Sequence, residues 1–85
     1  MTTATTMPLS SKATLSAALA KARTAVQLDQ AEYHDGAKRY YVEVVELLGR
    51  VIVRASSEND IKKLKDIRRT YSNRIEQLEE MLADA

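Results

Sequence analysis

The chain has 85 residues, which is enough for one small domain and too few to enclose a large internal pocket. Its 13 basic and 12 acidic side chains give a formal net charge of +1, which argues against nucleic-acid binding as the main function. Without cysteine the chain forms neither a disulfide framework nor a thiolate zinc site, and no apolar run approaches the ~18–20 residues that span a bilayer.

A threonine-rich segment, residues 1–9, comes first, and we expect it to be a flexible tail because it shows no periodicity and contains Pro8. A helix is expected over residues 11–31. It begins at Ser10 or Ser11, whose hydroxyl can accept hydrogen bonds from the first-turn amides. Its apolar positions recur every three or four residues, and the many alanines among them let neighbouring helices approach closely. They are Leu15, Ala18, Leu19, Ala22, Ala25 and Val26.

Two further helices are expected, over residues 34–55 and 58–83. The β-branched residues of the second could suggest a strand, but its apolar positions recur at helical spacing over a stretch too long for one strand. Ser57 and Asp60 resemble a capping box at the start of the third. Short connections favour antiparallel neighbours, so we predict an all-α, up-down-up three-helix bundle. The apolar stripes are Ala37, Tyr41, Val44, Leu48, Val51 and Ile52 in the second helix, and Tyr71, Ile75, Leu78 and Leu82 in the third.

The order and spacing of these stripes resemble a known family. The relevant stretches are Ala25-x3-Asp29-x7-Ala37-x3-Tyr41-x2-Val44-x3-Leu48 and Tyr71-x2-Arg74-Ile75-Glu76-x-Leu78-x3-Leu82. They resemble the MIT (microtubule-interacting and trafficking) domain from about Leu15 to Leu82. This resemblance implies a three-helix bundle related to tetratricopeptide-type helical hairpins. It also implies binding of short motifs, helical or extended, from the C-terminal tails of ESCRT-III-like proteins, by a monomeric domain of a larger protein.

The resemblance also implies a binding site. Glu76 matches the family's acidic residue that pairs with a basic side chain of the motif. Ser72 stands where well-studied members carry a leucine that lines the pocket between the second and third helices. The docking groove lies between these two helices, or between the first and third, and receives leucines spaced as on a helix. The residues expected to contact the partner are Glu76, Ser72, Arg68, Glu79, Lys65 and Ile75 on the third helix, and Val42, Gly49 and Val53 on the second.

Simpler interpretations exist for the same residues. The polar row on the third helix could be a solvated charged edge, and Val42 and Val53 could be covered by a neighbouring helix. The basic start of the third helix is interpreted as partnered surface charge, because acidic residues are interleaved with it. Its basic residues are Lys62, Lys63, Lys65, Arg68, Arg69 and Arg74. Tyr40, Tyr41 and Tyr71 are expected to be packing residues whose hydroxyls reach water.

Catalysis is not expected. His34 is the only histidine, Gly36 and Gly49 form no phosphate loop, and no cofactor or metal is implied. The N-terminal segment lacks the basic start and apolar centre of a signal peptide, so we expect a cytoplasmic protein.

We therefore predict a non-catalytic adaptor that brings its parent protein to endosomal trafficking membranes without inserting into them. One alternative is a structural or self-associating bundle. A weaker one is membrane or microtubule association through the basic half of the third helix.

Overall fold

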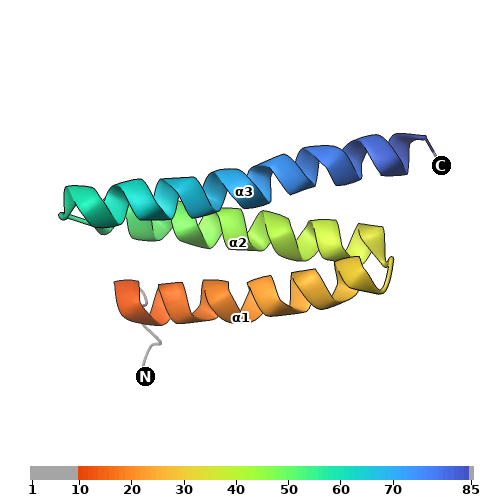
Figure 1. The fold of residues 1–85 in the computed structure, drawn as a ribbon. Coiled ribbons are helices and arrows are strands. Elements are labelled where there is room, and N and C mark those ends of the chain that lie inside the picture. The colour runs from red at the N-terminus through yellow and green to blue at the C-terminus, as the bar shows by residue number, and fades with distance from the viewer. Residues whose placement is uncertain (1–9, 85) are drawn as a thin grey trace, which may run out of the picture.

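The structure is a computed structural model, and it describes residues 10–84. These residues form three helices: α1 (Ser11–Gln30), α2 (His34–Arg54) and α3 (Glu58–Ala83). Consecutive helices run in opposite directions (Figure 1), so the predicted up-down-up arrangement is confirmed. The flexible tail predicted for residues 1–9 lies outside the described residues.

Serine side chains cap the N-termini of α1 and α3. The hydroxyl of Ser10 accepts a hydrogen bond of 3.1 Å from the amide of Ala13. The hydroxyl of Ser57 accepts one of 3.4 Å from the amide of Asp60. Each bond satisfies one of the amides that the first turn of a helix leaves without a partner, which is why the two helices begin where they do.

The C-terminus of α1 ends in a Schellman motif. The amide of Tyr33 donates to the carbonyl of Leu28 at 2.9 Å, and the amide of Glu32 donates to the carbonyl of Asp29 at 3.0 Å. This pair of bonds requires a left-handed residue between them, and Glu32 takes that position with φ 65°. Glycine is the residue best suited to such a position, because a side chain there clashes with the backbone. The turn therefore stores strain at Glu32.

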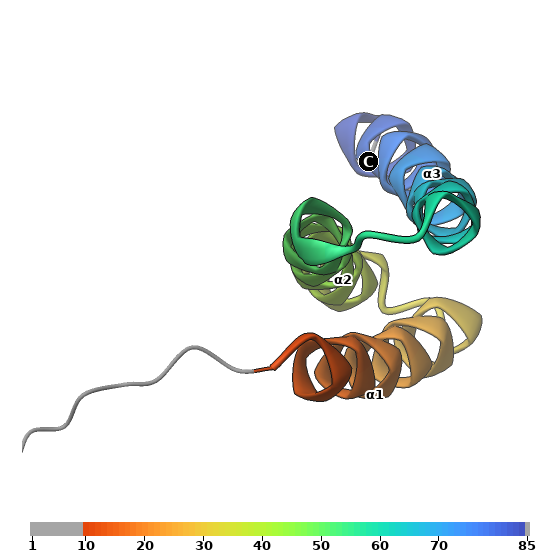
Figure 2. The same ribbon diagram turned by 90° about the vertical axis from the view of Figure 1, so that its left-hand side faces the viewer.

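Helix α2 lies between the other two helices (Figures 1 and 2). It contributes buried residues to both hydrophobic core clusters. Tyr71 of α3 packs against both clusters, and its ring stacks on Tyr41 with centroids 5.6 Å apart. The first cluster contains Ala18, Ala22, Val44, Leu48, Val51 and Leu64. The second contains Ala25, Ala37, Tyr41 and Leu78.

Helices α1 and α3 do not pack directly on each other. No Cα atom of α1 lies within 8 Å of a Cα atom of α3, whereas both helices pack along α2. The alanines of the α1 stripe are buried against α2, as expected. Leu19 and Val26 were predicted to belong to the same buried stripe, and this part of the prediction is wrong. They are exposed because they face the side where α3 does not close on α1.

Replacement of Glu32 by glycine is predicted to stabilise the protein by about 0.5–1 kcal/mol, because glycine adopts the left-handed conformation without a clash. Urea unfolding followed by circular dichroism measures the change. Glu32→Ala is the control, since alanine keeps the strained Cβ and should leave the free energy of unfolding nearly unchanged. A loss of stability in Glu32→Gly contradicts this view of the turn.

Candidate functional site

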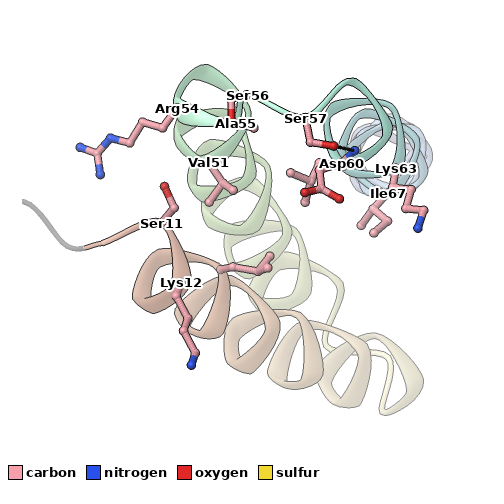
Figure 3. A pocket seen from close by; sticks show the side chains of 12 residues that line it. Ser11, Lys12, Val51, Arg54, Ala55, Ser56, Ser57, Asp60, Lys63 and Ile67 are labelled. Carbon is pink, nitrogen blue, oxygen red and sulfur yellow. Dashed lines mark hydrogen bonds between the residues drawn. The ribbon is translucent and has the colours of Figure 1, made fainter.

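A cavity of about 600 Å³ opens between α1 and α3 at the end where both helices begin. Leu15 of α1, Leu64 and Ile67 of α3, and Val51 of α2 supply its apolar lining. Figure 3 shows Ser11 and Lys12 on one side and Lys63 and Ile67 on the other. A concave, largely apolar site of this volume falls within the range of binding sites in other proteins.

The apolar surface continues along both helices. A second cavity, of about 420 Å³, is lined by Leu19, Val26 and other residues of α1, and by Tyr71 of α3. The lining positions follow each other at spacings of three and four, so they form one stripe on each helix. We call these two stripes, together with both cavities, the α1/α3 groove. Three of its large apolar side chains are notably exposed: Leu19 at 48%, Val26 at 37% and Ile67 at 41%.

An ion pair crosses the groove at its far end. The guanidinium of Arg74 donates two hydrogen bonds of 2.7 Å to the two carboxylate oxygens of Asp29. Asp29 lies three residues after Val26 on α1, and Arg74 lies three residues after Tyr71 on α3, so the pair continues the two lining stripes. The hydroxyl of Tyr41 on α2 donates to the same carboxylate at 3.0 Å. This network joins all three helices where the groove ends.

The network shifts the pKa values of Asp29 and Tyr41. The hydrogen bonds from Arg74 lower the pKa of the Asp29 carboxyl below its ordinary value, although desolvation opposes them. Burial, together with the hydrogen bond to Asp29, raises the pKa of Tyr41 to about 12. The prediction that the Tyr41 hydroxyl reaches water is therefore wrong, because this hydroxyl is bonded to Asp29 inside the bundle.

Comparison with known proteins identifies the family. The sequence matches the family model of the MIT (microtubule interacting and transport) domain over residues 15–80, which is most of the chain. The chain belongs to the MIT domain family. No significant match is found among curated proteins or among solved structures. MIT domains are protein-interaction modules and are generally not catalytic.

Residues 10–84 of this MIT domain contain neither a cluster of metal-ligating side chains nor a membrane-spanning helix. No group of three or more His, Asp or Glu side chains in this part of the chain is placed to hold a metal ion. None of the three helices is both long enough and apolar enough to cross a bilayer.

All the residues predicted to contact a partner lie on α2 and α3, and none of them lines either cavity of the α1/α3 groove. We call the surface that they form the α2/α3 flank. Two of them make contacts from α3 to α2. The Nη1 atom of Arg68 lies 3.6 Å from the point where a Cβ on Gly49 would stand. Glu79 forms an ion pair of 3.5 Å with Lys38. The side chains of this domain thus cross the α2/α3 flank at two levels.

The remaining predicted residues differ in exposure. Ile75 packs against the second core cluster, so most of its apolar surface already has a partner. Val42 is half-buried, and Val53 is 84% exposed, so the interpretation that a neighbouring helix covers Val53 is wrong. Ser72 is half-buried, whereas Lys65 and Glu76 are exposed. The role of this flank in partner binding stays a prediction.

The interpretation of the basic residues of α3 as partnered charge needs correction. Among residues 10–84, Arg69 pairs with Asp66 and Arg74 pairs with Asp29, but three lysines and Arg68 form no ion pair. Of the interleaved acidic residues, Asp66 pairs with Arg69, whereas Glu58 and Asp60 are exposed and form no ion pair with these lysines. The unpaired lysines are Lys62, Lys63 and Lys65.

Sequence reasoning missed the Asp29–Arg74 pair and the exposed wall of α1. The two paired residues are 45 positions apart, and helical periodicity gives no information about contacts at that separation. A signal was nevertheless present, since both residues belong to the spaced pattern that resembles the MIT family. Leu19 and Val26 carried no separate signal, because an apolar stripe has the same appearance whether the neighbouring helix covers it or not.

Replacement of Asp29 by asparagine is predicted to destabilise the domain by about 1.5–3 kcal/mol, because it leaves Arg74 without its counter-charge. Urea unfolding measures the effect. The matched control is Asp35→Asn, which breaks the Asp35–Arg39 pair, whose side chains are 66% and 76% exposed. The control is expected to cost less than about 0.5 kcal/mol. Equal losses in the two variants contradict a special role for Asp29.

The same pair predicts a dependence on pH. Because the pKa of Asp29 is lowered in the folded state, its contribution is complete above the ordinary value of 3.8 and is lost as the pH falls through the lowered pKa. The difference in free energy of unfolding between the natural protein and Asp29→Asn should therefore be constant at about pH 5–8 and shrink at lower pH. Denaturant titrations over this range measure it. A difference that persists unchanged at pH 2 argues against the ion pair as its source.

Proposed function

We propose that this MIT domain binds short peptide segments in the α1/α3 groove, and that the segments are C-terminal tails of ESCRT-III-like proteins. Family membership supports a peptide-binding module. The observation that carries the choice of groove is the apolar lining on both walls. Leu19 and Val26 on α1 and Ile67 on α3 are exposed there, beside the partly buried Leu15 and Tyr71.

The α1/α3 groove is favoured over the α2/α3 flank for a physical reason. Exposed Leu19, Val26 and Ile67 have apolar surface that a ligand can cover, and covering such surface is the main driving force of association. Along the α2/α3 flank, Ile75 already packs in the core, and Arg68 and Glu79 extend toward α2. A peptide there would first have to displace these charged side chains.

The groove suits a short apolar segment better than a large partner. Each leucine, isoleucine or valine that becomes fully buried contributes about 1.5–3 kcal/mol, and only two or three fit along such a groove. The cost of association offsets much of this gain, so dissociation constants are expected in the range of roughly 1–1000 µM. Weak binding of this kind suits reversible recruitment of the protein to trafficking membranes.

Titration of the labelled domain with ESCRT-III tail peptides, followed by residue-resolved NMR, tests the proposal. The expected result is a set of saturable shifts at Leu19, Val26 and Ile67. Ile67→Asn should weaken binding about tenfold or more, because it replaces a groove methyl surface with an amide. The matched control Val53→Asn makes the same type of change on exposed α2 surface and should leave the affinity unchanged.

The variant Glu76→Lys distinguishes the two surfaces. If the peptide binds the α2/α3 flank, one of the two grooves expected from the sequence, Glu76→Lys abolishes binding and Ile67→Asn does not. If saturating peptides shift no groove resonance in the natural protein, the proposed function fails. Sedimentation of the free domain completes the test, since a stable dimer that protects the groove favours the self-associating bundle instead.

A further inference from the structure

Charge is separated along the length of the bundle. At the end that holds the N-termini of α1 and α3, residues 10–16 and 50–65 carry six basic side chains against two acidic ones. We call this the basic end; its cations are Lys12, Arg50, Arg54, Lys62, Lys63 and Lys65. At the opposite, acidic end, residues 25–38 and 74–84 carry seven acidic side chains against Lys38 and Arg74. The net charge of +1 is thus the sum of an excess of positive charge at one end and an excess of negative charge at the other.

The helix dipoles act in the same direction as the side chains. The N-termini of α1 and α3 and the C-terminus of α2 lie at the basic end (Figure 1), so two positive helix ends outweigh one negative end. The acidic end has the reverse balance. Side chains and backbone thus produce a positive potential over one end of the bundle.

Five of the six cations of the basic end are available to an external partner. Within the described part of the chain, Lys12, Arg50, Lys62, Lys63 and Lys65 form no ion pair. The two cations of the acidic end are both engaged, Lys38 with Glu79 and Arg74 with Asp29. A bundle built for stability alone gains little from unpaired charges gathered in one region, since like charges repel.

An exposed apolar side chain accompanies these cations. Val53 lies in the last turn of α2 between Arg50 and Arg54, and it is 84% exposed. Cations beside a projecting apolar group match the composition of a bilayer surface, where anionic headgroups lie above the acyl chains. An exposed valine contributes little to nucleic-acid binding, which relies on phosphate contacts and on aromatic rings that stack on bases. The tyrosines lie outside the basic end, at positions 33, 40, 41 and 71.

We propose that the basic end adsorbs onto anionic lipid bilayers, with Val53 at the headgroup boundary and the acidic end directed away from the membrane. The contact is peripheral and electrostatic, and no helix inserts. It is a second function beside peptide docking. The basic end includes the mouth of the first cavity, which Lys12, Arg54 and Lys63 line. In this orientation the second cavity, lined by Leu19 and Val26, remains open to a tail peptide along the side of the bundle.

Co-sedimentation with vesicles of phosphatidylcholine and phosphatidylserine tests the proposal. Binding is expected at low salt, and it should disappear with phosphatidylcholine alone or at high salt, where screening is nearly complete. Each basic residue close to an anionic surface strengthens binding by about fivefold. The double variant Lys62→Glu with Lys65→Glu should therefore bind at least about 25-fold more weakly. Both positions are exposed, and glutamate is a good helix former, so the fold is retained.

The matched control is Arg23→Glu with Arg39→Glu, which changes the net charge equally at exposed positions outside the basic end. The control should bind several-fold better than the Lys62 and Lys65 variant. Equal loss in the two double variants overturns the proposal, because binding then follows net charge alone. Equal binding to neutral vesicles also overturns it.

Fluorescence gives an independent test of orientation, because the chain contains no tryptophan. Val53→Trp places a single reporter at the basic end, and Tyr33→Trp places one near the acidic end at a position that is 66% exposed. Anionic vesicles should shift the emission of the first reporter to shorter wavelength and leave the second unchanged. Shifts in both reporters, or only in the second, contradict the proposed orientation.

Two further outcomes separate this proposal from others. Ile67→Asn should retain vesicle binding, so loss of peptide docking and loss of lipid binding can be distinguished. If single-stranded RNA binds more tightly than anionic vesicles, and this binding also depends on Lys62 and Lys65, the surface is a nucleic-acid site and the lipid proposal is wrong.

Discussion

The ion pair between Asp29 and Arg74 connects α1 and α3, two helices that do not otherwise pack directly on each other. Because Tyr41 of α2 donates to the same carboxylate, the network fixes all three helices at one level of the bundle. From this level toward the basic end, α1 and α3 each pack on α2, and their backbones do not close on each other. An open apolar groove follows from this arrangement, since both helices carry apolar residues on the sides that remain uncovered.

The groove illustrates how a small domain can keep apolar surface available without losing its fold. The two core clusters use the alanines of α1 for close packing, so the larger residues of that helix are not all required in the core. Leu19 and Val26 remain exposed on α1 and line the second cavity, and Ile67 remains exposed on α3 and lines the first. The proposed lipid surface and the proposed docking groove belong to the same helices. The cations gather at one end of the bundle, whereas the apolar lining runs along its side.

Much of the fold could be predicted from the sequence, and the reasons are local. Helical periodicity identified the three helices, and the serines at positions 10 and 57 indicated where two of them begin. The left-handed Glu32 could not be predicted, because glutamate gives no local signal for that conformation.

The site was less predictable than the fold. A stripe of leucine, valine and alanine specifies that a face is apolar, but not which part of it a neighbour leaves open. That depends on the angle between helices and on a contact between residues 45 positions apart. Ion pairing was equally hard to predict: acidic residues near Lys62 and Lys65 in sequence suggested partners, yet these lysines have none within residues 10–84. Partner binding at the α2/α3 flank, one of the two grooves expected from the sequence, stays a prediction.

The most direct measurement is the set of intermolecular NOEs between a saturating, unlabelled ESCRT-III tail peptide and the methyl-labelled domain. The account predicts NOEs from the peptide to the methyl groups of Leu19, Val26 and Ile67. NOEs to Val42 and Ile75 in their place, or none to any methyl group at saturation, would contradict it.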